Sequence, residues 1–257
     1  MQEGINWEFI FPEIIGESPA LKQLLQRVKE VALRDDKVLL VGEAGSGKES
    51  MARALHRISP RRRGSFIKVN CAAIGAGLLE SELFGDEEGI SRDSSGPKIG
   101  RLELANEGTL FLHEIADFPL ELQPKLLYLL ERREFARKGS TRSIPVNVRL
   151  IAGTSYDLEK RIAEHRFRQD LYDHLKPSLI RVPPLRERRQ DIPLLADYFV
   201  RRFARRINKR IAAISVETAN TLMKWDWLGN VRELENFIER AVVTTEGLTL
   251  HAQLPEM

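Results

Sequence analysis

The sequence predicts an α/β fold in which a parallel sheet is covered by helices on both faces and is followed by a smaller helical domain. Short apolar segments near residues 37–41, 66–69, 108–112, 148–152 and 178–182 alternate with amphipathic helical patterns. Such alternation is typical of parallel sheets. The first apolar segment runs directly into a glycine-rich segment that ends in lysine, which indicates a phosphate-binding loop.

Length and composition limit the class of protein. The 257 residues are 42% apolar and 30% charged, enough for one large domain and one smaller domain. No run of about 18 apolar residues could span a bilayer, and the first residues lack the pattern of a signal peptide. The single cysteine, Cys71, excludes an internal disulfide and fits a reducing compartment. We therefore expect a cytoplasmic protein that makes no membrane contact.

Basic residues are grouped at 61–63, 186–189 and 201–210, although the net charge is only +3. One interpretation is a nucleic-acid surface. The other is a solvated helix face, which we favour because Phe203 and Ile207 keep helical spacing in the last group. Direct DNA binding is therefore not inferred from charge.

The strand pattern ends at residues 183–185, and helical patterns follow near 190–207, 215–224 and 230–244. We expect an α/β domain over residues 1–184 and a helical domain over 185–257. Gly229 and Asn230 supply a turn and a helix cap before the last helix. The apolar face of that helix should consist of Val231, Leu234, Phe237, Ile238 and Ala241.

The candidate phosphate-binding loop consists of Gly42, Glu43, Ala44, Gly45, Ser46, Gly47, Lys48 and Glu49. Its three glycines allow backbone amides to turn toward a phosphate, Lys48 adds positive charge, and the following helix directs its dipole at the anion. A glycine-rich turn without function would explain neither Lys48 nor the second apolar strand with an acidic end at Glu114. Glu49 stands where a serine or threonine usually binds magnesium, so one hydroxyl ligand is absent.

Several motifs then occur in a specific order. They are GESPAL from Gly16, the phosphate loop, FIKVNCAAI from Phe66, LLESELFG from Leu78, EGTLFLHEI from Glu107, LERREFARKGS from Leu130, VPPLRER from Val182 and WLGNVREL from Trp227. In these motifs, from about Ile14 to Thr245, the chain resembles the AAA+ domain of bacterial enhancer-binding proteins, the NtrC-like activators of sigma-54 RNA polymerase. The fold implied is a three-layer P-loop AAA+ domain with a small all-α lid.

The resemblance implies a ring, a hexamer in the family, with ATP or ADP bound between subunits. It assigns nucleotide binding to the loop from Gly42 to Glu49, to Ile15 and to the lid residue Arg232. It also implies that Glu114 is catalytic, that Asn70 relays nucleotide state to it, and that Arg168 is the first of two arginines offered to a neighbouring subunit. The family itself commonly carries glutamate at the position of Glu49.

Three positions depart from the chemistry of the family. His113 falls on the aspartate that holds magnesium, and imidazole is a poor substitute for a hard oxygen ligand, so Mg²⁺ should be held weakly. A softer metal at His113 is disfavoured because no cysteine or second histidine lies nearby in the sequence. Ser155 replaces the asparagine of the first sensor, and His174 replaces the second arginine, whose fixed bidentate charge histidine cannot supply.

The loop that contacts the sigma factor is also altered. The GAFTGA motif of the family falls on GISRDS, Gly89 to Ser94, so that Ser91 and Arg92 replace its aromatic residue and threonine. We therefore expect altered contact with the sigma factor. The second insertion of the family, from Arg133 to Val146, is predicted to remain a hairpin.

These departures favour a degenerate member that binds ATP or ADP and uses the nucleotide to control assembly or partner contacts, with weak or no hydrolysis. One alternative is an active ATPase that remodels sigma-54 polymerase and recruits Asp117 to the magnesium. Another is a regulator of a different polymerase holoenzyme that needs no hydrolysis. The sequence shows neither a receiver-like segment before residue 12 nor a helix-turn-helix after the lid, so we expect an excised central domain or a minimal member that reaches DNA only through a domain absent here.

Overall fold

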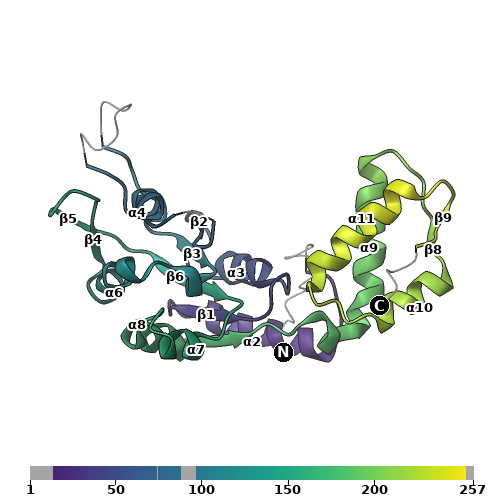
Figure 1. The fold of residues 1–257 in the computed structure, drawn as a ribbon, viewed down its shortest axis with the longest axis horizontal. Helices are drawn as coiled ribbons and strands as arrows, with labels where there is room; N and C mark the ends of the chain where they lie inside the picture. The colour runs from purple at the N-terminus through teal and green to yellow at the C-terminus, as the bar shows by residue number, and fades with distance from the viewer. Residues whose placement is uncertain (1–13, 74, 88–96, 253–257) are drawn as a thin grey trace. The chain divides into compact units, whose positions relative to one another are not determined.

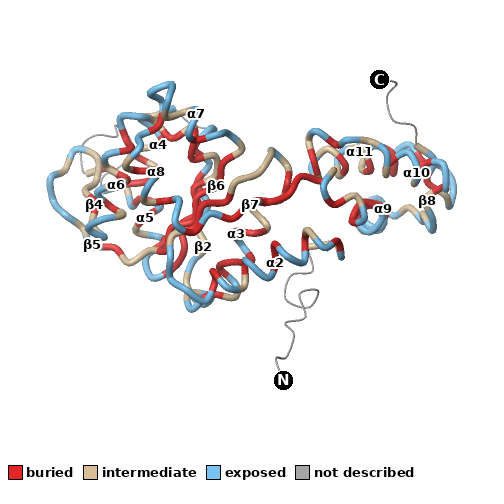
Figure 2. Tube along the Cα trace, turned by 90° about the horizontal axis from the view of Figure 1, so that it is seen from below, coloured by how far each residue is buried: buried red, intermediate tan, exposed pale blue. Residues whose placement is uncertain are grey.

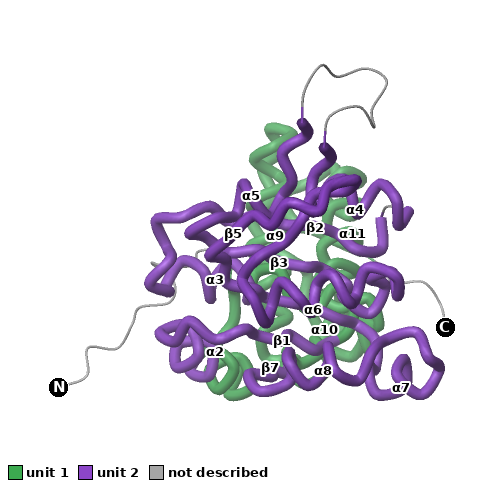
Figure 3. The backbone as a smooth tube through the Cα atoms, turned by 90° about the vertical axis from the view of Figure 1, so that its left-hand side faces the viewer, with its two compact units in different colours: residues 1–25, 43–50, 182–257 green, residues 26–42, 51–181 purple. Residues whose placement is uncertain are grey.

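The computed structural model of this chain describes residues 14–73, 75–87 and 97–252. The altered loop from Gly89 to Ser94 lies outside the described residues. The chain forms two compact units, one of residues 1–25, 43–50 and 182–257 and the other of residues 26–42 and 51–181 (Figure 3). We call them the lid unit and the sheet unit. The lid unit includes most of the candidate phosphate loop.

The sheet unit contains a five-stranded parallel sheet in the order β2-β3-β6-β1-β7 (Figure 1). These strands are β1 (Val38–Val41), β2 (Phe66–Asn70), β3 (Thr109–His113), β6 (Arg149–Thr154) and β7 (Leu179–Arg181). All the predicted strands are confirmed. Because the strands are parallel, their carboxyl ends lie at one edge of the sheet, and the segments that follow β1, β2, β3 and β6 begin there.

One face of the sheet packs against α4 (Ala76–Phe84), α6 (Gln123–Arg132), α7 (Leu158–Ala163) and α8 (Gln169–Leu175). Their leucines and Phe84 form one core with buried residues of β2, β3 and β6. Figure 2 shows that these strands consist largely of buried residues. The β1-to-β2 connection runs in the opposite direction across the sheet, so a right-handed crossover places α3 (Lys48–Arg57) on the other face. The chain also contains α2 (Pro19–Ala32), α5 (Arg101–Leu104) and short 3₁₀ segments, η1 (Ile115–Asp117), η2 (Leu120–Leu122) and η3 (Lys176–Ser178).

The predicted hairpin between Arg133 and Val146 is present. Strands β4 (Glu134–Ala136) and β5 (Ser143–Pro145) pair in antiparallel fashion. Asp86 forms isolated bridges with Lys98 and Lys138, so the hairpin lies beside the two segments that lead to residues 88–96.

The lid unit contains η4 (Leu185–Asp191), α9 (Ile192–Arg206), α10 (Val216–Lys224) and α11 (Asn230–Thr244). The three predicted helices are confirmed, and Leu234, Ile238 and Ala241 of α11 are buried as expected. The prediction that strands end before the helical region was wrong in one detail. Strands β8 (Ala213–Ile214) and β9 (Thr249–Leu250) form a short parallel pair, held by two residues each.

Two further expectations about the lid unit need correction. Asn230 does not cap its own helix, because α11 has no side-chain cap bond and the Asn230 side chain turns toward the phosphate loop. Ile207 lies just beyond the end of α9 and is 37% exposed, so it does not continue the buried face. The arginines of α9 do form a solvated face, with Arg202 lying over Phe203.

Within the part of the chain that the structure describes, no helix combines the length and apolar character needed to cross a lipid bilayer.

Candidate nucleotide-binding site

The phosphate loop continues from the carboxyl end of β1, where the Gly42 N–H donates to the carbonyl of Thr154 at the end of β6 (3.2 Å). Gly45 and Gly47 have φ values of +73° and +104°, a region that favours glycine. A Cβ on Gly45 would also lie 2.2 Å from the Gly229 carbonyl oxygen. Glycine is therefore required at position 45 by both conformation and packing.

Polar groups in this loop suit an anion. Lys48 is 4% exposed, and its Nζ donates to the Glu43 carbonyl at 3.1 Å. The Ser46 Oγ is buried and has no hydrogen-bond partner among the described residues. The N–H groups of Gly45 and Gly47 likewise donate to no acceptor within the described part of the chain. An oxyanion such as a nucleotide phosphate would satisfy these donors, so the loop fits the predicted ligand.

Residues of the lid unit surround the loop. The Arg186 guanidinium forms a bidentate ion pair with the Glu43 carboxylate, at 2.5 and 2.7 Å. Asn230 is fully buried and donates from Nδ2 to Glu43 Oε2 at 3.1 Å and to the Ala44 carbonyl at 3.0 Å. The Arg232 Cβ lies 3.1 Å from where a Cβ on Gly45 would be. The structure thus brings the predicted lid arginine beside the predicted loop.

The segment around Ile15 is fixed in the same unit. Ile15 is half-buried and packs against the hydrophobic core of the lid unit. The buried Asp191 carboxylate accepts hydrogen bonds from Glu17 N (2.8 Å), Ser18 N (2.8 Å) and Ser18 Oγ (2.7 Å). All the predicted nucleotide-binding residues except Gly42 therefore belong to the lid unit.

The predicted catalytic residue Glu114 lies in the sheet unit, directly after β3, in the left-handed conformation (φ 57°, ψ 58°). Its carboxylate accepts two hydrogen bonds from Ser155, one from the backbone N–H at 2.7 Å and one from Oγ at 2.6 Å. His113 Nε2 lies 3.9 Å from Glu114 Oε1. The structure thus brings Glu114, His113 and Ser155 together.

Asn70 ends β2 and is paired in register with His113 of β3. Its side-chain oxygen accepts a hydrogen bond from Ala72 N at 3.3 Å. The next residue, Cys71, donates from its backbone N–H to the His113 carbonyl at 2.9 Å. Burial, reinforced by the nearby carboxylates of Asp117 and Glu114, raises the pKa of the Cys71 thiol, so the thiol stays protonated.

Arg168 precedes α8, where its guanidinium pairs with the Asp170 carboxylate at 3.0 and 2.6 Å. This ion pair raises the pKa of Arg168. His174, near the end of the same helix, contacts Glu131 through Nε2 (3.2 Å) and Lys37 through Nδ1 (3.4 Å). Both positions that the resemblance assigns to a neighbouring subunit are therefore engaged by acidic groups of their own chain.

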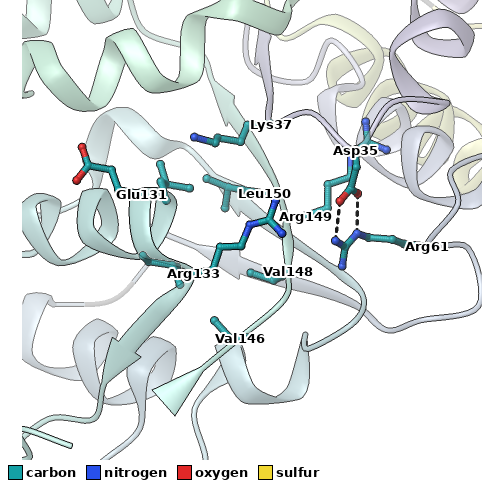
Figure 4. Close-up of a pocket in the computed structure, with 11 residues that line it drawn as sticks. Asp35, Lys37, Arg61, Glu131, Arg133, Val146, Val148, Arg149 and Leu150 are labelled. Atoms are coloured by element: carbon teal, nitrogen blue, oxygen red, sulfur yellow. Dashed lines mark hydrogen bonds and ion pairs between the residues drawn. The ribbon is translucent and has the colours of Figure 1, made fainter. Parts of the chain in front are cut away.

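Lys37 and Glu131 also line a cavity of about 300 Å³ at the amino ends of β1 and β6 (Figure 4). The charges of this cavity are largely paired internally. Arg61 forms a bidentate pair with Asp35 at 2.6 Å, and the buried Arg149 donates to the carbonyls of Val31, Ala32 and Asp36. The cavity contains none of the residues predicted to bind nucleotide.

A magnesium site is poorly supported by the donors present. No group of three or more His, Cys, Asp or Glu side chains suited to a metal ion occurs among the described residues. At the end of β3 the position next to Glu114 carries the imidazole of His113, and the Glu114 carboxylate is already held by Ser155. Asp117, the alternative ligand, pairs with Arg161 at 3.3 Å. These residues do not fit the hard oxygen set that Mg²⁺ prefers.

Sequence reasoning missed the partners of the site residues. Arg186, Asn230 and Asp191 organise the loop segments, and Ser155 holds Glu114 rather than standing alone. Arg186 and Asn230 lie within the motifs VPPLRER and WLGNVREL, so the motifs could have marked them as candidate site residues. The residues that they contact are far away in the sequence, so the motifs could not show those contacts. The residues around Asp191 in the sequence do not distinguish it from an aspartate on the protein surface.

A phosphate loop after the first of five parallel strands, with an acidic residue after another strand of the same sheet and a helical segment at the end, defines a P-loop protein of the AAA+ class. A model of the Sigma-54 interaction domain family matches residues 14–181, and a model of the AAA+ ATPase lid domain matches residues 186–256. The chain belongs to the sigma-54 interaction domain family.

Relatives agree with this membership. The chain is 52% identical to the DNA-binding transcriptional activator HyfR of Escherichia coli over 94% of its own length and 36% of that protein. It is 52% identical to the formate hydrogenlyase transcriptional activator FhlA of the same organism over 98% of its own length, again 36% of that protein. The chain thus spans about a third of the length of these relatives.

Among solved structures, NtrX from Brucella abortus superposes with a TM-score of 0.85 at 39% identity, covering 91% of this chain and 52% of that one. Further structures of the same protein were determined in complex with ADP and with ATP, each with a TM-score of 0.84.

Proposed function

We propose that this chain is the nucleotide-binding AAA+ module of a sigma-54-type bacterial transcription regulator, in which ATP or ADP controls assembly or partner contacts and hydrolysis is weak. Residues 1–184 supply the α/β domain and residues 185–257 the lid. The module assembles with further copies of itself, and DNA is reached through other parts of the regulator.

The binding half of the proposal rests on the phosphate loop. Ser46 Oγ and the N–H groups of Gly45 and Gly47 lack protein acceptors among the described residues, and Lys48 supplies a buried positive charge beside them. A phosphate group would satisfy all of these. The NtrX structures with ADP and ATP support the same ligand for this chain.

The proposal of weak hydrolysis rests mainly on the two hydrogen bonds that Ser155 donates to the Glu114 carboxylate, at 2.7 and 2.6 Å. A carboxylate that orients or deprotonates an attacking water must offer an acceptor to that water. Ser155 occupies one acceptor site on each Glu114 oxygen, and His113 stands in place of a hard metal ligand, so Glu114 has fewer acceptor sites left for a water and no carboxylate beside it to hold a metal. The loss of a second trans arginine at His174 acts in the same direction, because such a group contributes about 10³ to 10⁵ in rate in related systems.

Calorimetric titration of ADP and ATP, with and without Mg²⁺, followed by a phosphate-release assay on the same sample, tests the proposal. We expect saturable binding that depends little on Mg²⁺ and only background phosphate release. Lys48→Ala should abolish binding and serves as the control for specificity. Robust turnover that Lys48→Ala removes would overturn the proposal.

A restoration series identifies which departures limit hydrolysis. His113→Asp alone should raise phosphate release by less than about tenfold, because residues of one catalytic unit act non-additively. The triple variant His113→Asp, Ser155→Asn and His174→Arg should raise it by about 10² or more. A large gain from His113→Asp alone would instead favour a site that is otherwise competent.

The active-ATPase alternative requires Asp117 to leave its ion pair with Arg161 and reach a metal. Asp117→Asn separates the alternative from our proposal. It should remove phosphate release if Asp117 holds the metal, and it should leave release at its background level if our proposal is right. Whether the module acts on sigma-54 polymerase or on another holoenzyme depends on the loop from Gly89 to Ser94. A binding assay with each purified sigma factor, comparing this chain with a variant that carries GAFTGA, distinguishes the two.

A further inference from the structure

Within the lid unit, residues 185–231, which we call the lid segment, hold the phosphate loop through its backbone carbonyls. The backbone carbonyls of four consecutive loop residues are each hydrogen-bonded. Glu43 O accepts from Lys48 Nζ at 3.1 Å and from Ser46 N at 3.2 Å. The next three carbonyls all accept from residues of the lid segment. Ala44 O is bonded to Asn230 Nδ2 (3.0 Å), Gly45 O to Val231 N (3.1 Å) and Ser46 O to Arg188 Nη2 (2.7 Å).

These carbonyl contacts determine where the loop amides point. In a planar trans peptide the C=O of one residue and the N–H of the next are antiparallel. Fixing the carbonyls of Ala44 and Ser46 against the lid therefore directs the N–H groups of Gly45 and Gly47 away from it. Those two N–H groups have no acceptor within the described residues. The contacts with the lid segment thus leave two backbone donors available to an anion.

We propose that Asn230 and Arg188 are positioning residues that prearrange the phosphate loop for nucleotide, an inference that rests on the proposed nucleotide binding. Asn230 is the more informative of the two. It is fully buried, adopts φ 57°, and accepts from Leu185 N through Oδ1 (2.7 Å) while Nδ2 serves Glu43 and Ala44. One side chain therefore links the start of the lid segment to the loop.

Substitution of Asn230 by glycine tests the proposal without adding charge. Glycine tolerates φ 57° and removes the amide donor to the loop. The matched control is Asn208→Gly, since Asn208 belongs to the same unit, has φ 55° and is exposed. Asn230→Gly should weaken ADP and pyrophosphate binding by about tenfold or more, because it releases a buried carbonyl contact, whereas Asn208→Gly should stay within about twofold of the unmodified chain.

A second measurement does not depend on nucleotide. The Val231 N–H donates to Gly45 O, so its hydrogen exchange should become about tenfold faster in Asn230→Gly and remain unchanged in Asn208→Gly. Failure of the unmodified chain to bind ADP would overturn the proposed function, and the exchange rates would still decide whether Asn230 holds the loop. Equal ADP affinity and equal Val231 exchange in the two variants would overturn the inference.

If Asn230→Gly does not fold, Asn230→Asp keeps the side-chain shape and the acceptor for Leu185 N but loses the donor to Ala44 O. The same exchange readout then applies, with faster Val231 exchange expected. Unchanged exchange in Asn230→Asp would contradict the positioning role. Arg188→Gln should act on the Ser46 carbonyl in the same direction, with weaker ADP binding as the expected result.

Discussion

The buried carboxylate of Asp191 should be among the most important single groups for the stability of the lid unit. It is fully buried and accepts three hydrogen bonds, from Glu17 N, Ser18 N and Ser18 Oγ, at 2.7 to 2.8 Å. Gly16 packs directly on it, since a Cβ at that position would lie 2.4 Å from the Asp191 Cγ. Removal of the carboxylate therefore leaves two backbone donors and a hydroxyl without partners, and the two donors of Ser18 are buried.

Each unsatisfied buried donor costs about 1 to 3 kcal/mol, so Asp191→Ala should lower the free energy of unfolding of the lid unit by roughly 3 to 5 kcal/mol after local relaxation. Asp191→Asn retains one acceptor oxygen and should cost about half as much. Urea unfolding followed through tryptophan fluorescence measures both, because Trp227 is fully buried and Trp225 half-buried in the same unit. The control is Asp197→Ala, whose ion pair with Arg201 is exposed and should contribute less than about 1 kcal/mol.

An Asp191→Ala value within about 0.5 kcal/mol of the Asp197→Ala value would refute the reasoning. It would mean that the segment from Gly16 to Ser18 finds other acceptors or is not held in place by Asp191. A large loss of stability in Asp191→Ala together with an equally large loss in Asp191→Asn would indicate that the negative charge matters more than the count of hydrogen bonds.

Three further predictions concern the sheet unit. Arg149→Met should lower the free energy of unfolding by roughly 3 kcal/mol in urea denaturation, because the carbonyls that this buried arginine serves would lose their donors. The hydrogen bond from Arg61 holds the pKa of Asp35 below its ordinary value of 3.8. The stabilisation from this pair is therefore present above that value and is lost as the pH falls through the lowered pKa, so Asp35→Asn should flatten the acid limb of a stability profile. Ser155→Ala removes one of the two bonds to Glu114 and should change nucleotide affinity by less than about threefold, as measured by calorimetry.

Much of the fold could be predicted because its strands are buried on both faces. Continuous apolar segments such as β3 and β6 are the expected pattern for a parallel sheet, and each was found near its predicted position. The pair β8 and β9 was missed because two residues per strand carry no periodic signal. The cap at Asn230 was misassigned for a different reason, since a distant segment offered the side chain better partners than its own helix did.

The sequence predicts candidate site residues only where they lie in one local motif. Lys48 lies in a loop that is recognisable by its glycines, and Glu114 directly follows the apolar strand β3. The pairing of Glu43 with Arg186 joins residues 143 positions apart, and the pairing of Glu114 with Ser155 joins residues 41 positions apart. Helix and strand periodicities relate residues only a few positions apart, so they cannot predict these pairs. The sequence could show that Ser155 is shorter than asparagine, but its two bonds to Glu114 depend on β3 and β6 being neighbours.

In the proposed function, binding and hydrolysis make different demands on this chain, and the substitutions at His113, Ser155 and His174 affect hydrolysis alone. Binding needs oriented amides, the Lys48 charge and a fixed loop, and these groups are retained. Under the same proposal, hydrolysis also requires a Glu114 carboxylate that can accept from water, a hard metal ligand and two trans arginines. At these positions the chain has the Ser155 contacts to Glu114, His113 and His174. A nucleotide that is bound without being consumed can still act as a regulator. At a concentration 100 times its Kd it stabilises the state that binds it by about 2.7 kcal/mol, enough to shift an assembly equilibrium by about 100-fold.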